Sequence, residues 1–169
     1  MPELDSLRGV AILAVVFYHG LYWSAVDVPL RGLASWLRLL SRAGWTGVNL
    51  FFVLSGFLIT GILLDTRDRP DFYRRFYARR ALRILPACYA TLAILWVAGI
   101  STPAFVGLGC VFLSNVSPLL GVPMSYGPLW SLSVEEHFYL LWPTLVRRLG
   151  MRLISAAAAL IIVLEPLAR

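Results

Sequence analysis

Long uncharged stretches separated by arginine clusters dominate the pattern of hydrophobic and polar positions along the chain. Three of these stretches are the 18 residues from Gly9 to Val26, the 22 from Ala43 to Leu64 and the 51 from Ile84 to Val134. At about 1.5 Å of helical rise per residue, the first two reach about 27 and 33 Å, close to the thickness of a bilayer's hydrocarbon core. The pattern predicts an all-α, multi-pass transmembrane helical bundle with about five to six apolar segments, one of them re-entrant.

A basic stretch, residues 65–83, separates the second uncharged run from the third. It holds seven arginines against three aspartates, and by the positive-inside rule this composition marks a cytoplasmic loop. The N-terminus lies two spans earlier, so we expect it on the cytoplasmic side as well. Phe72 and Phe76, like Arg79 and Arg83, recur at four-residue intervals. This spacing favours an amphipathic helix along the inner membrane surface.

The 51-residue run supplies a third span, Ile84–Ile100, and then a segment rich in proline and glycine. Residues 103–116 are fewer than the roughly 17 that a straight crossing needs. If they cross, three arginines after residue 146 face outside, against the positive-inside rule. If they are re-entrant or lie along the outer surface, these arginines return to the cytoplasm, and we expect this second arrangement. The last apolar run, Leu153–Leu164, has only 12 residues, as if a chain were cut off early.

Composition agrees with a membrane protein. Hydrophobic residues make up 59% of the chain, the mean hydropathy is +0.77, and only 14% of residues are charged, against about a quarter in soluble domains. The net charge of +6 gathers between the apolar runs, which gives no basic stripe for nucleic acid. All 15 basic residues are arginine, whose guanidinium suits phosphate and carboxylate partners. Glu3 and Asp5 stand where a signal peptide would carry basic residues, so we expect the first span to be retained.

His19 is an ionisable residue inside the first span. Removing such a group from water costs several kcal/mol unless a partner or a wet cavity receives it, so it is a candidate functional residue. The alternative is an imidazole at the membrane interface that hydrogen-bonds a backbone carbonyl. Tyr18, Tyr22 and Trp23 favour that alternative, because aromatic side chains gather at interfaces.

Two carboxylates, Glu135 and Glu136, and a histidine stand at the start of another predicted span. In a helix, Glu135 shares a face with Tyr139, and Glu136 points about 100° away. The alternative is an ordinary helix N-terminus, where acidic residues complement the helix dipole and Ser131 or Ser133 caps the first turn.

Small residues in the second span predict close helix packing. Backbones approach closely in lipid where side chains are small. We therefore expect Ser55, Gly56 and Gly61 to lie in a helix–helix contact.

Four blocks of sequence, taken in order, resemble the signatures of the membrane acyltransferase-3 family of bacterial O-acyltransferases. The resemblance implies a single membrane-embedded acyltransferase domain over residues 1–169, placed in the bacterial cytoplasmic (inner) membrane. It also implies transfer of an acyl group, often acetyl, from acyl-CoA to a hydroxyl of a sugar, a cell-surface glycan or a lipid-linked sugar. The blocks are LDSLRG at 4–9 followed by His19, GVNLFFVLSGFLI at 47–59, FYARRALRILP at 76–86 and LWSLSVEEHFYLLWP at 129–143.

The resemblance assigns catalytic roles to three residues. Arg8 and His19 match an arginine and a histidine of the family's first span, and Glu135 matches the glutamate of its last block. A neutral histidine near pH 7 suits a general base, and a nonpolar site keeps it neutral. Our hypothesis makes His19 the base that acts on the acceptor hydroxyl, with Glu135 orienting it or sharing its proton. The alternative is an acyl-enzyme formed on His19 or on a serine.

The resemblance places the binding site of the acyl donor at a group of arginines. Arg80 and Arg83 match the family's Arg-x-x-Arg pair, and Arg79 and Arg75 lie beside them. The forked guanidinium binds phosphate with paired hydrogen bonds, so we expect these four side chains to bind the CoA phosphates from the cytoplasmic side. The hypothesis needs no metal.

The chain is shorter than the members of this family, and this leaves two other functional classes open. Family members carry more spans than this chain, so we expect it to correspond to their N-terminal half and to be truncated relative to them. A transporter or channel fragment would also place His19 in a span, but it does not explain the arginine-rich stretch followed by the glutamate block. A non-catalytic remnant or assembly subunit would keep the helices without the activity.

Overall fold

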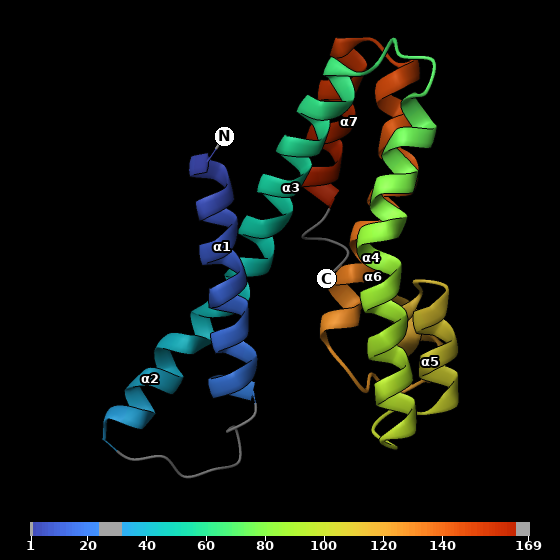
Figure 1. Ribbon diagram of the computed structural model, residues 1–169. Helices are drawn as coiled ribbons and strands as arrows, with labels where there is room; N and C mark the ends of the chain where they lie inside the picture. The colour runs from blue at the N-terminus through green and yellow to red at the C-terminus, as the bar shows by residue number, and fades with distance from the viewer. Residues whose placement is uncertain (1, 24–31, 165–169) are drawn as a thin grey trace. The chain divides into compact units, whose positions relative to one another are not determined.

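The computed structural model describes residues 2–23 and 32–164 (Figure 1). These residues are helical wherever they form regular structure, and they contain no strand, so the all-α prediction is confirmed. In chain order the elements are α1 (Pro2–Phe17), the π-helix η1 (Tyr18–Trp23), α2 (Leu33–Ser41), the 3-10 helix η2 (Arg42–Trp45), α3 (Thr46–Asp65), α4 (Phe72–Val97), α5 (Pro103–Cys110), the 3-10 helix η3 (Ser114–Leu120), α6 (Pro128–Arg148) and α7 (Met151–Leu164).

The chain divides into two compact units, Met1–Gly61 and Ile62–Arg169. In the first unit, α1 begins at Pro2, seven residues before the uncharged run predicted from Gly9. At its other end it continues directly into η1. The predicted end of the first span, Val26, lies outside the described residues.

The second helix of this unit is also longer than the sequence predicts. The elements α2, η2 and α3 follow one another from Leu33 to Asp65, whereas the uncharged run begins only at Ala43. Arginine and leucine are both good helix formers, so Arg38 and Arg42 extend the helix instead of ending it.

Two helices of the described chain are long and apolar enough to cross a membrane. They are Leu33–Asp65 and Phe72–Val97, whose most apolar 18-residue stretches have mean hydropathies of 2.1 and 1.4. Two further apolar helices, Ser6–Gly20 and Met151–Leu160, are shorter. The structure thus supports membrane-crossing helices, and the count of five to six segments stays a prediction.

Helix α4 joins the arginine-rich stretch and the third predicted span in one element. The sequence predicts a surface helix up to Arg83 and a separate span from Ile84, but α4 continues through both. No glycine or proline occurs between Phe72 and Leu85, and Pro86 lies inside the helix without ending it. Apolar side chains such as Leu82 are exposed on α4, as expected of a surface that meets lipid.

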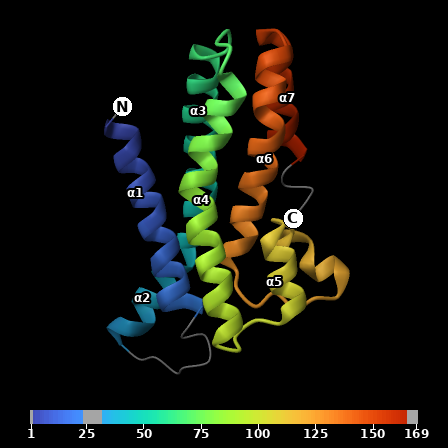
Figure 2. The same ribbon diagram turned by 45° about the vertical axis from the view of Figure 1, so that its right-hand side comes forward.

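The segment between α4 and α6 is too short to cross a bilayer as a helix. Helix α5 has 8 residues and begins at a Thr102 cap, whose side-chain oxygen accepts a hydrogen bond from the Phe105 backbone N–H at 3.2 Å. Phe105 and Leu92 join α5 to α4 in a buried core. Helix α6 then runs back alongside α4 (Figures 1 and 2). This course is the one expected of a re-entrant or surface segment.

The loop before α4 is hydrogen-bonded to the C-terminal end of α6. The Arg67 guanidinium donates hydrogen bonds to the carbonyls of Arg147, at 3.3 Å, and Leu149, at 2.9 Å, at the C-terminal end of α6. The Arg147 guanidinium in turn lies 5.0 Å from the ring centres of Phe72 and Tyr73. The last turn of α6 and the first turn of α4 therefore meet at the same end.

Candidate functional site

His19 lies in the π-helical turn η1, which begins at Tyr18 directly after α1. Its side chain is half-buried, and its ring meets the Tyr18 ring edge to face with 5.3 Å between the ring centres. Short π-helical segments are rare and occur often at functional sites, because the widened turn redirects side chains and frees backbone groups. His19 therefore stands at a local departure from regular helix.

Two glycines hold the end of α1 close to its neighbour. A Cβ atom added at Gly44 would collide with the Ala14 backbone carbonyl, and one at Gly47 would lie 2.6 Å from the Ala11 carbonyl oxygen. Such close approach of backbones requires glycine. The turn before His19 is thus fixed against the start of the second helix.

Of the three small residues expected in a helix–helix contact, Ser55 is buried, with 3% of its surface exposed. A Cβ atom added at Gly56 or Gly61 would meet no atom within 4 Å in the described structure. These two glycines thus make no close contact within the described residues, and their role in helix packing stays a prediction. The close packing is supplied by Gly44 and Gly47, which lie nearer the start of the span.

Arg8 lies on α1, eleven residues before His19. Its guanidinium carbon is 5.2 Å from the centre of the Phe51 ring on α3. At about 1.5 Å of rise per residue, Arg8 and His19 are about 16 Å apart along the helix. Arg8 is therefore anchored by a cation–π contact at some distance from the histidine.

The second cluster lies between α4 and α6. The guanidinium carbon of Arg80 is 3.2 Å from the centre of the Tyr139 ring, whose residue is 3% exposed. The Glu135 carboxylate belongs to the preceding turn of α6 and lies close enough to interact with the Tyr139 hydroxyl. Glu135, Tyr139 and Arg80 thus form a connected set that joins the two helices.

Both carboxylates of the predicted site lie near this arginine. Glu135 and Glu136 are close enough to act electrostatically on Arg80. The Glu136 Oε1 and Arg80 Nε atoms are buried and have no hydrogen-bond partner in the described part of the chain. Buried polar atoms of this kind are uncommon and mark a place where a ligand or water is needed.

The alternative explanation of these glutamates as helix-terminal residues is excluded. Helix α6 begins at Pro128, and its first turn contains no acidic residue. Ser131 and Ser133 donate to the carbonyls of Pro128, at 3.0 Å, and Leu129, at 2.9 Å, within the helix, so neither caps it. The carboxylates therefore lie well inside α6.

The arginines of α4 differ in their surroundings. Arg79 and Arg83 are exposed and form no ion pair among the residues that the structure describes, and Arg83 is close enough to act on the Arg80 charge. Arg80 is half-buried and contacts the Tyr139 ring of α6. The Arg-x-x-Arg pair therefore offers one half-buried and one exposed guanidinium beside each other.

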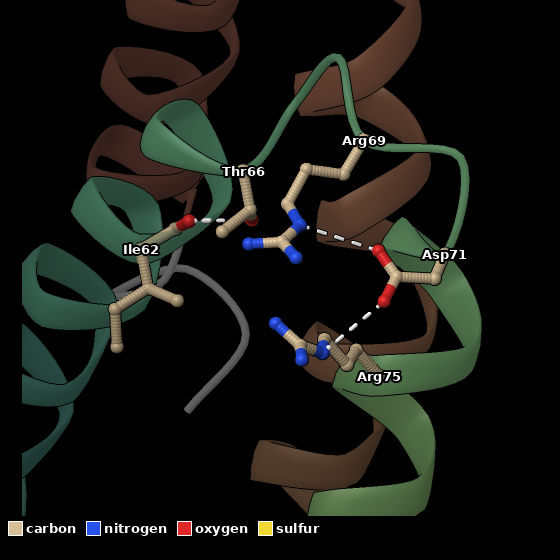
Figure 3. A network of polar contacts seen from close by, with 5 residues as sticks. All are labelled: Ile62, Thr66, Arg69, Asp71 and Arg75. Atoms are coloured by element: carbon tan, nitrogen blue, oxygen red, sulfur yellow. Dashed lines mark hydrogen bonds and ion pairs between the residues drawn. The ribbon is translucent and has the colours of Figure 1, made fainter.

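Arg75 is already paired. Its Nε lies 3.2 Å from one carboxylate oxygen of Asp71, whose other oxygen lies 3.3 Å from the Nε of Arg69 (Figure 3). Partial desolvation of Asp71 would raise its pKa, but the two guanidinium groups outweigh it and hold the pKa below the usual value. Arg75 therefore contributes less free positive charge than the sequence predicts.

Tyr139 is the residue of this cluster to which the sequence assigned no role. Its one sequence signal is its position four residues after Glu135, on the same helix face. Its contact with Arg80 depends on the packing of two helices that are far apart along the chain. Within the described residues, no group of three or more His, Cys, Asp or Glu side chains could hold a metal ion.

Comparison with known proteins agrees with the resemblance seen in the sequence. A family model described as an acyltransferase domain matches residues 1–165. The peptidoglycan O-acetyltransferase OatA of Listeria monocytogenes is 32% identical over 162 residues, covering 85% of this chain and 24% of that protein. The putative peptidoglycan O-acetyltransferase YrhL of Bacillus subtilis is 32% identical over 185 residues, covering 98% and 26%.

A viral protein is also similar to this chain. A putative acetyltransferase of Acidianus two-tailed virus is 33% identical over 168 residues, covering 95% of this chain and 46% of that protein. No solved structure matches the chain. The chain spans about a quarter of the length of the Listeria and Bacillus relatives.

Proposed function

Because the chain belongs to the acyltransferase-3 family, we propose that it forms the donor-binding part of a membrane O-acetyltransferase that uses acetyl-CoA. Arg80, Arg83 and Arg79 bind the CoA phosphates, and Arg75, whose charge is partly balanced by Asp71, adds a weaker contact. The hydroxyl acceptor is a sugar of a cell-surface glycan. The names of the Listeria and Bacillus relatives support peptidoglycan as this glycan.

The observation that carries this proposal is the half-buried Arg80 guanidinium stacked on Tyr139. Stacking occupies one face of the guanidinium and leaves its N–H edge to bind a ligand. Charge-assisted hydrogen bonds from guanidinium to phosphate are among the strongest in proteins, and partial burial strengthens them further. The exposed Arg83 beside it adds a second donor for a diphosphate.

His19 is the general base of the proposal. It takes the proton of the acceptor hydroxyl as the oxygen attacks the thioester carbonyl, and the proton finally reaches the departing CoA thiolate. A neutral imidazole has the right affinity for a proton near pH 7. The π-helical turn around His19 supports this role.

Glu135 has two candidate roles. Its carboxylate is close enough to act electrostatically on Arg80, which supports a role in positioning the donor site. The sequence favours proton sharing with His19. In a Glu135→Gln variant, the first role raises the KM for acetyl-CoA at nearly constant kcat, whereas the second lowers kcat at nearly constant KM.

Titration of acetyl-CoA onto the purified chain tests the donor site. We expect saturable binding that an Arg80→Ala, Arg83→Ala double variant weakens at least tenfold, because two charge-assisted contacts are lost. The matched control is Arg148→Ala with Arg152→Ala, which removes the same charge from exposed arginines outside the proposed site. Equal weakening in both double variants would mean that net charge alone attracts the ligand.

A histidine substitution tests the base. Membranes that contain the protein receive acetyl-CoA and peptidoglycan fragments, and the release of free CoA thiol is measured. We expect His19→Gln to lower the rate by at least about a hundredfold, the usual contribution of general base catalysis. His137→Gln, the other histidine of the chain, serves as the control. A full rate in the His19→Gln membranes would remove His19 from the mechanism.

A further inference from the structure

The helix from Leu33 to Asp65 is longer than a bilayer's hydrocarbon core. Its 33 residues reach about 50 Å, whereas the core is about 30 Å thick. The uncharged part, Ala43–Leu64, is 22 residues long and fills the core by itself. When this part crosses, Arg42 lies at the edge of the core and α2 extends beyond it. Helix α2 is then at the depth of the lipid headgroups.

At this level α2 and the start of η2 form a groove of about 330 Å³. It is lined by Ser35, Trp36, Arg38, Leu39 and Arg42. Arg38 and Arg42 are one helical turn apart and so lie on the same face. The sequence from 33 to 45 contains no acidic residue.

The remaining side chains of the groove also suit an interface. Trp36 is 65% exposed, and tryptophan is enriched where headgroups meet acyl chains. The Ser35 hydroxyl donates to the Gly32 carbonyl at 2.7 Å, which fixes the side chain at the groove edge. Leu33 and Leu40 are exposed nearby, where an apolar partner would cover them.

We propose that this groove binds the phosphate of an anionic phospholipid headgroup. It does so in the leaflet at the end of α3 that is remote from Asp65. The Arg42 guanidinium, with Arg38 beside it, binds the phosphate oxygens, while Trp36 and the exposed leucines contact the upper part of the acyl chains. None of the residues of the proposed acetyl transfer lines this groove, so the two proposals fail or succeed separately.

Native mass spectrometry of the purified chain in detergent tests this site. Short-chain phosphatidylglycerol and phosphatidylcholine are titrated separately, and bound lipid is counted from the mass of the complex. We expect phosphatidylglycerol to bind more tightly, and Arg42→Gln to weaken it about fivefold while leaving phosphatidylcholine unchanged. One arginine near an anionic membrane surface contributes about 1 kcal/mol, which corresponds to that factor.

Three comparisons make the outcome decisive. Arg42→Lys keeps the charge and is expected to retain most of the preference, and Arg148→Gln, an exposed arginine on α6, is expected to have no effect. Inorganic phosphate is expected not to displace the lipid at equal concentration. Displacement by inorganic phosphate, or equal loss of both lipids in Arg42→Gln, would overturn the proposal.

Discussion

The guanidinium carbon of Arg80 lies 3.2 Å from the centre of the Tyr139 ring, so a charged side chain of α4 rests directly on an aromatic side chain of α6. Tyr139 is almost fully buried, and the Glu135 carboxylate lies close to it, one turn away on the same helix. A stacked guanidinium loses little further freedom when it binds an anion, because its plane is already fixed. This contact makes Arg80 the best positioned of the α4 arginines to bind a phosphate.

Replacing Tyr139 tests whether its ring orients Arg80. We expect Tyr139→Leu to weaken acetyl-CoA binding about tenfold, because a partly desolvated cation–π contact contributes up to about 2 kcal/mol. Tyr139→Phe keeps the ring and loses only the hydroxyl, so its affinity should stay within about threefold of the wild type. Isothermal titration calorimetry at two salt concentrations measures both. Equal weakening in the two variants would assign the effect to the hydroxyl and contradict the role of the ring.

Gly44 is predicted to be essential for the packing of α1. We expect Gly44→Ala to lower the free energy of unfolding by about 1–3 kcal/mol, because the added methyl collides with the Ala14 carbonyl. Gly56→Ala is the control, since it has open space and gains helix propensity, so it should be neutral or slightly stabilising. Thermal unfolding in detergent, followed by circular dichroism, compares the two. A Gly44→Ala protein as stable as Gly56→Ala would show that the close approach is dispensable.

The sequence predicts the helical class and the arginine-rich stretch well, because uncharged runs and charge clusters are local features. It misplaces the boundary within α4. A charged segment looks like a loop, yet arginines are good helix formers, and no residue between Phe72 and Leu85 breaks the helix. The pattern of charges indicates which residues lie inside the membrane. Where a helix begins and ends depends instead on the helix propensity of its residues.

The candidate site is only partly readable from the sequence. Arg80 and Glu135 stand out as charged residues beside apolar runs, and the structure brings both of them close to Tyr139. Tyr139 itself looks like an ordinary aromatic residue of a span, because its importance arises from a contact between helices distant in the sequence. The pairing of Arg75 with Asp71 likewise follows from side-chain geometry that a count of charges does not reveal.

Asp71 should make stability depend on pH. Its folded-state pKa is lowered by Arg69 and Arg75, so its carboxylate stabilises the fold above the unfolded-state pKa of about 4. This contribution is lost as the pH falls through the lowered folded-state value. We therefore expect the Tm difference between wild type and Asp71→Asn to be constant from pH 7 to about 5 and to shrink toward pH 3. A difference that grows on acidification would contradict the sign of this effect.

Arg67 is predicted to matter more for stability than its neighbour Arg69. Arg67 satisfies two carbonyls at the end of α6, and hydrogen bonds from a charged group contribute about 1.5–3 kcal/mol. Arg69 makes an exposed ion pair, which contributes at most about 1 kcal/mol. Thermal unfolding of Arg67→Ala and Arg69→Ala at equal ionic strength measures the difference. The prediction fails if Arg69→Ala is the less stable of the two.

The central claim is that the arginine face of α4 recognises the phosphates of CoA, and a comparison of two ligands tests it most directly. Acetyl-CoA and acetyl-pantetheine, which lacks every phosphate, are titrated onto the wild type and onto the Arg80→Ala, Arg83→Ala variant. We predict that the wild type prefers acetyl-CoA by at least about a hundredfold and that the variant reduces this preference to about tenfold or less. Equal affinity of the wild type for the two ligands, or a preference that the substitutions leave unchanged, would contradict the account.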